Sequence, residues 1–183
     1  MRRPLVLLIS VSMWVAACGG PNATPPPSTV SASPGILLVG AREQVQARPP
    51  NGNVAAAFDV AMQLARANGN DLGYPWIDPT SGALVVSLVT PHGRELVEQS
   101  GISVPYTTRR VAHGAAELLK IQDDATRLVD EGMPGAELIV ETLPDQRDNR
   151  TLLRITSSSP ELLQALATRF PAEALAVEVK AGP

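Results

Sequence analysis

Cysteine and aromatic residues are the scarcest features of this 183-residue chain. Cys18 is the only cysteine, and Trp, Tyr and Phe occur twice each. A single cysteine excludes a disulfide framework within the chain. With so few aromatic side chains, the hydrophobic core must be built from Leu, Val, Ile and Ala. The length allows one ordinary domain or two very small ones.

Positive charge is also in short supply. The chain has 15 Lys and Arg residues against 18 Asp and Glu residues, a net charge of −3. Removing the first 17 residues, which contain Arg2 and Arg3, leaves 13 basic and 18 acidic residues, a net charge of −5. Nucleic-acid binding requires clustered basic residues, and Arg109-Arg110 is the largest such concentration in the body of the chain. We therefore expect no nucleic-acid partner.

Sequence motifs for catalysis, metal binding and nucleotide binding are absent as well. The chain has no GxSxG, HExxH or GxxxxGK[ST] motif, and His92 and His113 are not spaced as a metal-binding pair. The oxygen-rich segment 145–149 lacks the spacing of a calcium-binding loop, which favours a solvated hairpin turn. We predict that the protein is not an enzyme and needs neither a metal nor another cofactor.

The first 17 residues have the layout of a secretory signal peptide. Arg2-Arg3 precedes an apolar run, Leu5 to Val15, which is followed by Ala16 and Ala17. The run is shorter than the roughly 20 residues that a transmembrane helix needs. Cys18 comes next. Taken alone it suits a reactive thiol, a metal ligand or half of a disulfide, but no His, Asp or Glu lies near it in the sequence.

The segment Val15-Ala16-Ala17-Cys18 is similar to the lipobox of bacterial lipoproteins. This resemblance implies that Cys18 is alkylated with diacylglycerol and becomes the new N-terminus after cleavage. The protein would then be anchored in the cell membrane by lipid, on the extracytoplasmic side. Residues 18–35 are rich in Pro and Ser and carry no charge, which predicts an extended tether that spans up to roughly 50 Å. Residues 36–183 remain for the folded body.

Hydrophobic periodicity predicts an α+β body with an internal repeat. Two hairpin-helix-strand units are expected, over residues 74–110 and 136–180, joined by a long helix over 112–131. An additional helix is expected over 53–68, and a first strand over 36–39. We expect antiparallel pairing with the helices against the sheet. The pattern leaves open whether the units form one sheet or two.

The first hairpin carries a second resemblance. Tyr74 to Val89 combines an aromatic-x-aromatic start, an Asp-Pro turn, Gly82 and a Leu-Val-Val strand. This is similar to the pro-region repeats of streptogrisin-type secreted serine proteases, and a second, more diverged copy spans about 149–179. No protease domain follows in this sequence. The resemblance therefore implies a chaperone or inhibitor that acts on a separate protease.

These features predict a non-catalytic binding or assembly domain held at the cell envelope, with an envelope protein as partner. Its contact site would be an open sheet edge or exposed apolar residues of the first hairpin. Tyr74 and Trp76 are candidates for an aromatic binding surface, or they cover the core. A small-ligand carrier or sensor is the alternative, and it predicts an enclosed apolar cavity lined by Trp76 and the long helix.

Overall fold

The computed structural model describes residues 36–40, 50 and 52–180 of the chain. All of them belong to the larger of the two units into which the chain divides, residues 32–183. The expected signal peptide, Cys18 and the tether lie outside the described residues. The predictions that concern them are therefore carried by the sequence alone.

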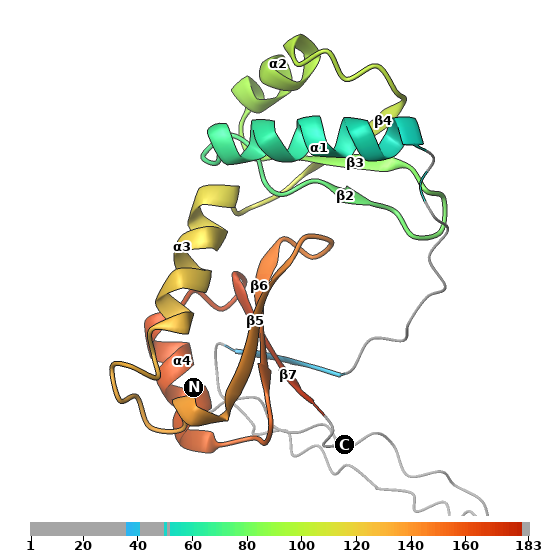
Figure 1. The fold of residues 1–183 in the computed structure, drawn as a ribbon. Helices are drawn as coiled ribbons and strands as arrows, with labels where there is room; N and C mark the ends of the chain where they lie inside the picture. Colours follow the sequence, from blue (N-terminus) through green and yellow to red (C-terminus); the bar gives the residue numbers. More distant parts are fainter. Residues whose placement is uncertain (1–35, 41–49, 51, 181–183) are drawn as a thin grey trace, which may run out of the picture. The chain divides into compact units, whose positions relative to one another are not determined.

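The first half of the body is a three-stranded sheet with two helices (Figure 1). Its elements are α1 (Gly52–Ala67), β2 (Trp76–Ile77), β3 (Leu84–Leu88), α2 (Pro91–Gln99) and β4 (Tyr106–Arg110). The strand order is β2-β3-β4, with β2 antiparallel to β3 and β4 parallel to β3. This places the two-residue strand β2 and the five-residue strand β4 at the edges.

The second half repeats the same order of elements. These are α3 (Ala115–Thr126), the short 3-10 helix η1 (Ala136–Leu138), β5 (Ile139–Asp145), β6 (Arg150–Ile155), α4 (Pro160–Arg169) and β7 (Leu175–Val179). A further strand, β1 (Leu37–Val39), pairs in parallel with β7. The sheet order is β1-β7-β6-β5. Each half therefore reads helix, hairpin, helix, strand, and the two halves form separate sheets.

The α+β class and the two hairpin-helix-strand units are confirmed, but the expected antiparallel pairing is wrong in part. Strands β3 and β4, β6 and β7, and β1 and β7 are parallel. The reason is the helix between β3 and β4, and between β6 and β7, which carries the chain back to the end of the sheet where the previous strand began. The joining helix is also shorter than predicted and ends at Thr126.

The crossover helices of the two units begin in the same way. Thr90 caps α2 by accepting a hydrogen bond from the Gly93 N–H, and Ser159 caps α4 by accepting one from the Leu162 N–H. In both helices proline follows the cap, where its missing N–H costs no hydrogen bond. The predicted start of the second helix at Ser159-Pro160 is confirmed, and the shared start supports the internal repeat.

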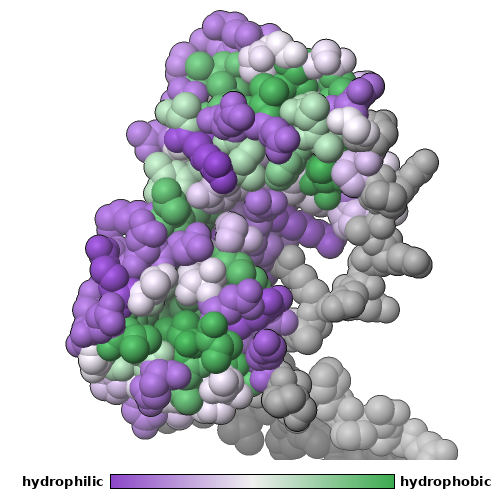
Figure 2. Space-filling model, viewed as in Figure 1, coloured by the Kyte–Doolittle hydropathy of each residue, from purple (hydrophilic) through white to green (hydrophobic). Residues whose placement is uncertain are grey.

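Each half has its own hydrophobic core. In the first, residues of α1 and α2 pack on the face of β3 that carries Leu84, Val86 and Leu88. In the second, residues of α3 and α4 pack on β6 and β7. Tyr74 packs against both cores. On the face that Figure 2 shows, hydrophilic residues border the hydrophobic surface, so exposed apolar area alone does not define a binding site.

A polar contact joins the turn between β5 and β6 to the segment that connects the two halves. The side chain of Asn149, in the turn between β5 and β6, bonds to the backbone of His113, which precedes α3. Its Oδ1 accepts the His113 N–H at 2.8 Å, and its Nδ2 donates to the His113 carbonyl at 2.8 Å. Asn149 is buried and has a left-handed φ of 54°, which Asn adopts more readily than most residues.

The turn between β5 and β6 therefore differs from the solvated turn that the sequence predicted. Asp145, Asn149 and Arg150 are buried. Arg150 pairs through Nε with Asp145 Oδ2 at 3.0 Å and through Nη2 with Asp148 Oδ2 at 2.9 Å. The carboxylates that suggested a cation ligand set thus pair with the Arg150 guanidinium. The turn also contacts the first half, because the Arg147 guanidinium lies over the Trp76 ring and the Arg147 carbonyl accepts a hydrogen bond from Arg109 Nη1.

Candidate functional site

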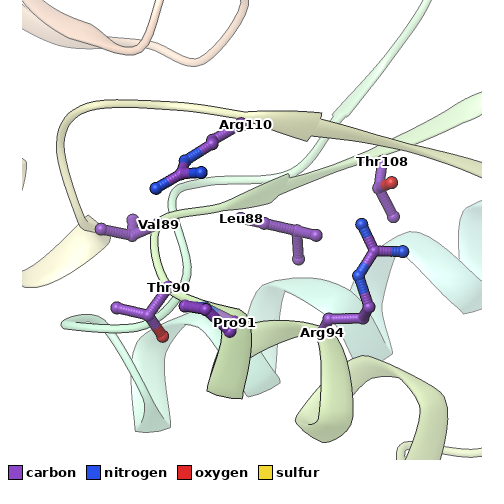
Figure 3. Close-up of a pocket in the computed structure, with 7 residues that line it drawn as sticks. All are labelled: Leu88, Val89, Thr90, Pro91, Arg94, Thr108 and Arg110. Atoms are coloured by element: carbon purple, nitrogen blue, oxygen red, sulfur yellow. The ribbon is translucent and has the colours of Figure 1, made fainter.

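A pocket with two arginines lies between β4 and the start of α2 (Figure 3). Its volume is about 260 Å³. The end of β3, the cap and first turn of α2, and the face of β4 nearest that helix contribute its lining: Leu88, Val89, Thr90, Pro91, Arg94, Thr108 and Arg110. The pocket therefore combines an apolar floor with basic and hydroxyl side chains.

Strand geometry explains why Thr108 and Arg110 share this pocket. Side chains of a strand alternate between its two faces, so Tyr106, Thr108 and Arg110 lie on one face. Tyr106 packs against the core that contains α1 and α2. The helix-facing side of β4 therefore carries the other two residues, and α2 supplies Arg94 from its first turn. In Figure 3 Arg94 and Arg110 lie on opposite sides of Leu88.

Both guanidinium groups are without an anionic partner among the described residues. Arg94 and Arg110 are exposed, and neither forms an ion pair or a side-chain hydrogen bond within the part of the chain that the structure describes. Arg154, by contrast, has two anionic partners. It lies between Glu141 and Glu178, at 2.8 and 2.7 Å. The pocket thus presents two positive charges that can accept an anion from outside the chain.

The hydroxyl of Thr90 is already engaged. It donates to Asp71 Oδ1 at 2.5 Å and accepts the Gly93 N–H at 3.2 Å. The first turn of α2 is therefore capped from within the protein. Binding capacity in the pocket comes from Arg94, Arg110 and the exposed Thr108.

The two aromatic residues singled out from the sequence are both half-buried, but in different surroundings. Tyr74 contacts both hydrophobic cores, and burial raises the pKa of its phenol above the ordinary value of 10.0. Trp76, in β2, has the Arg147 guanidinium 5.9 Å from its ring centroid, within the range of a cation–π contact. Tyr74 thus covers the core, whereas a binding role for Trp76 stays a prediction.

Each histidine has a carboxylate close to its ring: Glu95 of the same helix for His92, and Glu117 of the following helix α3 for His113. His92 Nδ1 is 3.2 Å from Glu95 Oε2, and His113 Nδ1 is 3.2 Å from Glu117 Oε2. His113 also lines a second pocket of about 200 Å³, which Arg110 shares. Its other ring nitrogen, Nε2, is buried and has no hydrogen-bond partner among the described residues.

Metal binding finds no support in the described ranges. Within residues 36–40, 50 and 52–180, no three His, Cys, Asp or Glu side chains gather closely enough to hold a metal ion.

Comparison of the chain with protein-family models and with curated proteins finds no match. The resemblance of the first hairpin to protease pro-regions therefore stays a prediction, and functional inference rests on the residues themselves.

Sequence reasoning missed the two-arginine pocket. Arg109-Arg110 was visible as the largest basic concentration, but too small for a nucleic-acid patch. Arg94 lies 16 positions before Arg110 in the sequence, and the two line one pocket because β4 returns parallel to β3 beside α2. The alternation in Thr107-Thr108-Arg109-Arg110 was the available signal, since it places Arg109 and Arg110 on opposite faces.

Proposed function

We propose that this protein is a membrane-anchored bacterial lipoprotein with a non-catalytic binding or assembly domain at the cell envelope. The pocket with Arg94 and Arg110 supports the binding role, because two exposed cations that have no anionic partner among the described residues suit an anionic group of another molecule. The anchor rests on Cys18 and the residues before it.

The proposed anchor agrees with simple membrane energetics. Two acyl chains hold a protein stably at a membrane, whereas one chain gives only marginal binding. Diacylglycerol on Cys18 supplies two chains. No helix in the described ranges is long and apolar enough to cross a membrane. Residues 18–35 would then set the distance between the folded body and the lipid surface.

No specific observation favours the carrier alternative. It predicted an enclosed apolar cavity lined by Trp76 and the long helix. Neither of the pockets that share Arg110 includes Trp76 or a residue of α3. Both are lined in large part by polar and charged side chains of β4 and the segments near it.

Fractionation and affinity capture test the proposal together. We expect the wild-type protein to pellet with membranes and to incorporate labelled fatty acid, and we expect Cys18→Ser to lose the label. Cross-linked wild-type protein should recover a defined envelope protein, which Arg94→Gln/Arg110→Gln recovers in reduced amount. Absence of label in the wild type would refute the anchor. Equal recovery by the double variant would refute the role of the pocket.

A further inference from the structure

We infer that β4 and the two-arginine pocket together bind an extended acidic peptide segment of a partner protein, which adds to the sheet as a strand beside β4. This deepens the proposed binding role and rests on it, but it does not depend on the lipid anchor. Three observations carry it: a strand edge and two cations beside it that have no partner among residues 36–40, 50 and 52–180, and a pocket lined by both apolar and basic side chains.

The outer edge of β4 is available for pairing. Sheet order β2-β3-β4 leaves β4 with β3 as its only strand neighbour in the described chain. The Val111 N–H donates to the Leu88 carbonyl of β3 at 2.9 Å. Backbone amides alternate in direction along a strand, so the amides of Thr107 and Arg109 also point to β3. Those of Thr108 and Arg110 point away from β3, toward the open edge.

The same two residues therefore offer both backbone and side-chain contacts. Thr108 and Arg110 present N–H and C=O groups along the edge and side chains into the pocket. An added strand would form ladder hydrogen bonds with their backbones. Every second side chain of that strand would then lie over the pocket, because side chains alternate between faces. A Glu or Asp at such a position reaches Arg94 and Arg110.

Charge complementarity favours an acidic segment over other peptides. The folded body is acidic overall, since 18 acidic residues oppose 13 basic ones after residue 17. Its open strand edge nevertheless carries Arg109 and Arg110, with Arg94 beside them. Charged residues on an edge strand also discourage pairing between identical copies, because two β4 edges would bring like charges together. An acidic strand beside β4 would instead bring opposite charges together.

A free small anion fits the site less well than a peptide. Arg94 and Arg110 are exposed, and an exposed ion pair contributes little on its own because water and salt screen it. The apolar floor formed by Leu88, Val89 and Pro91 and the unpaired backbone of β4 would stay unused. A peptide strand engages the cations, the apolar floor and the backbone edge at once.

The test uses the full-length protein with Cys18→Ser, purified in mild detergent, and a fluorescent peptide of alternating Val and Glu with blocked ends. We expect saturable binding that weakens as salt is raised. The same peptide with Gln in place of Glu should bind at least about fivefold more weakly, and Arg94→Gln and Arg110→Gln should each cost about fivefold. N-methylation of alternate peptide amides, which removes ladder donors without changing charge, should abolish binding.

Arg109→Gln is the matched control. It removes the same charge from the neighbouring position of the same strand, but on the opposite face, so we expect a smaller loss than for Arg110→Gln. Circular dichroism confirms that each variant is folded. An equal loss of peptide affinity in the two variants would show that only net charge matters, and would overturn the assignment of binding to the pocket.

Three other results would overturn the inference. They are no binding of the Val-Glu peptide to the Cys18→Ser protein with both arginines intact, equal binding of an alternating Val-Lys peptide, and undiminished binding of the N-methylated peptide. Competition by glutarate as effective as by the peptide would assign the site to a small anion instead. Fatty-acid labelling of Cys18 and recovery of an envelope partner are separate measurements. A failed peptide test would therefore refute this inference without refuting the proposed lipoprotein function.

Discussion

Asn149 provides the sharpest test of how the turn between β5 and β6 is held against the segment that connects the two halves. Its side chain makes two hydrogen bonds of 2.8 Å to the backbone of His113. Asn149→Ala removes both and leaves a half-buried donor and acceptor without their partners. Each lost bond costs about 1 kcal/mol. The left-handed φ of 54° adds about 1 kcal/mol for alanine. We therefore expect a loss of about 3 kcal/mol in the free energy of unfolding.

Asn149→Gly separates the two contributions. Glycine adopts the left-handed conformation without strain, so this variant loses only the hydrogen bonds, and we expect about 2 kcal/mol. Urea unfolding followed by far-ultraviolet circular dichroism measures both variants against the wild type. A loss below about 1 kcal/mol for Asn149→Ala would refute the importance of this contact. Glycine at least as destabilising as alanine would refute the contribution of backbone strain.

Three further predictions concern packing and titration. Gly114→Ala should destabilise by roughly 1–3 kcal/mol, because its Cβ would lie 2.0 Å from the Gly69 carbonyl oxygen. Gly52→Ala, which meets no atom within 4 Å, should stabilise by about 0.5–1 kcal/mol, and urea unfolding compares the two. Burial raises the pKa of Tyr74, so its contribution to stability is complete below about pH 10 and is lost as pH rises further. Tyr74→Phe should flatten that alkaline loss in urea titrations, and an unchanged slope would contradict it. Hydrogen bonds from the backbone N–H groups of Ser81 and Thr80 lower the pKa of the Asp78 carboxyl. The contribution of Asp78 to stability is therefore complete above about pH 4 and is lost as pH falls through the lowered pKa. Carbon-detected NMR should find a value under 3.8, and a higher one would refute this.

Local features of the fold were predictable from the sequence. The helix expected over 53–68 is observed at Gly52–Ala67. The turn at Asp78 to Gly82 forms as its residues suggest: Asp78 accepts backbone N–H bonds within the turn, and Gly82 adopts a φ of 71°. Hydrophobic spacing, caps and turn residues act over a few positions, so a single sequence displays them.

Contacts between distant segments were not predictable in the same way. The pairing of Leu37 with Ala176 joins opposite ends of the body, and no local pattern in a three-residue strand specifies its partner. The burial of Asp145 and Arg150 depends on the contact of their turn with His113. Arg94 and Arg110 line one pocket because β4 returns parallel to β3. Each is a consequence of tertiary packing rather than of local preference.

The N-terminal chemistry of the mature protein decides whether Cys18 is a lipid anchor. Intact and N-terminal peptide mass spectrometry of the protein, extracted in detergent from its own membranes, measures both cleavage and lipid attachment. We predict a chain that begins at Cys18 and carries diacylglycerol on its sulfur. A chain that retains residues 1–17, or a mature chain with a free thiol at Cys18, would contradict it.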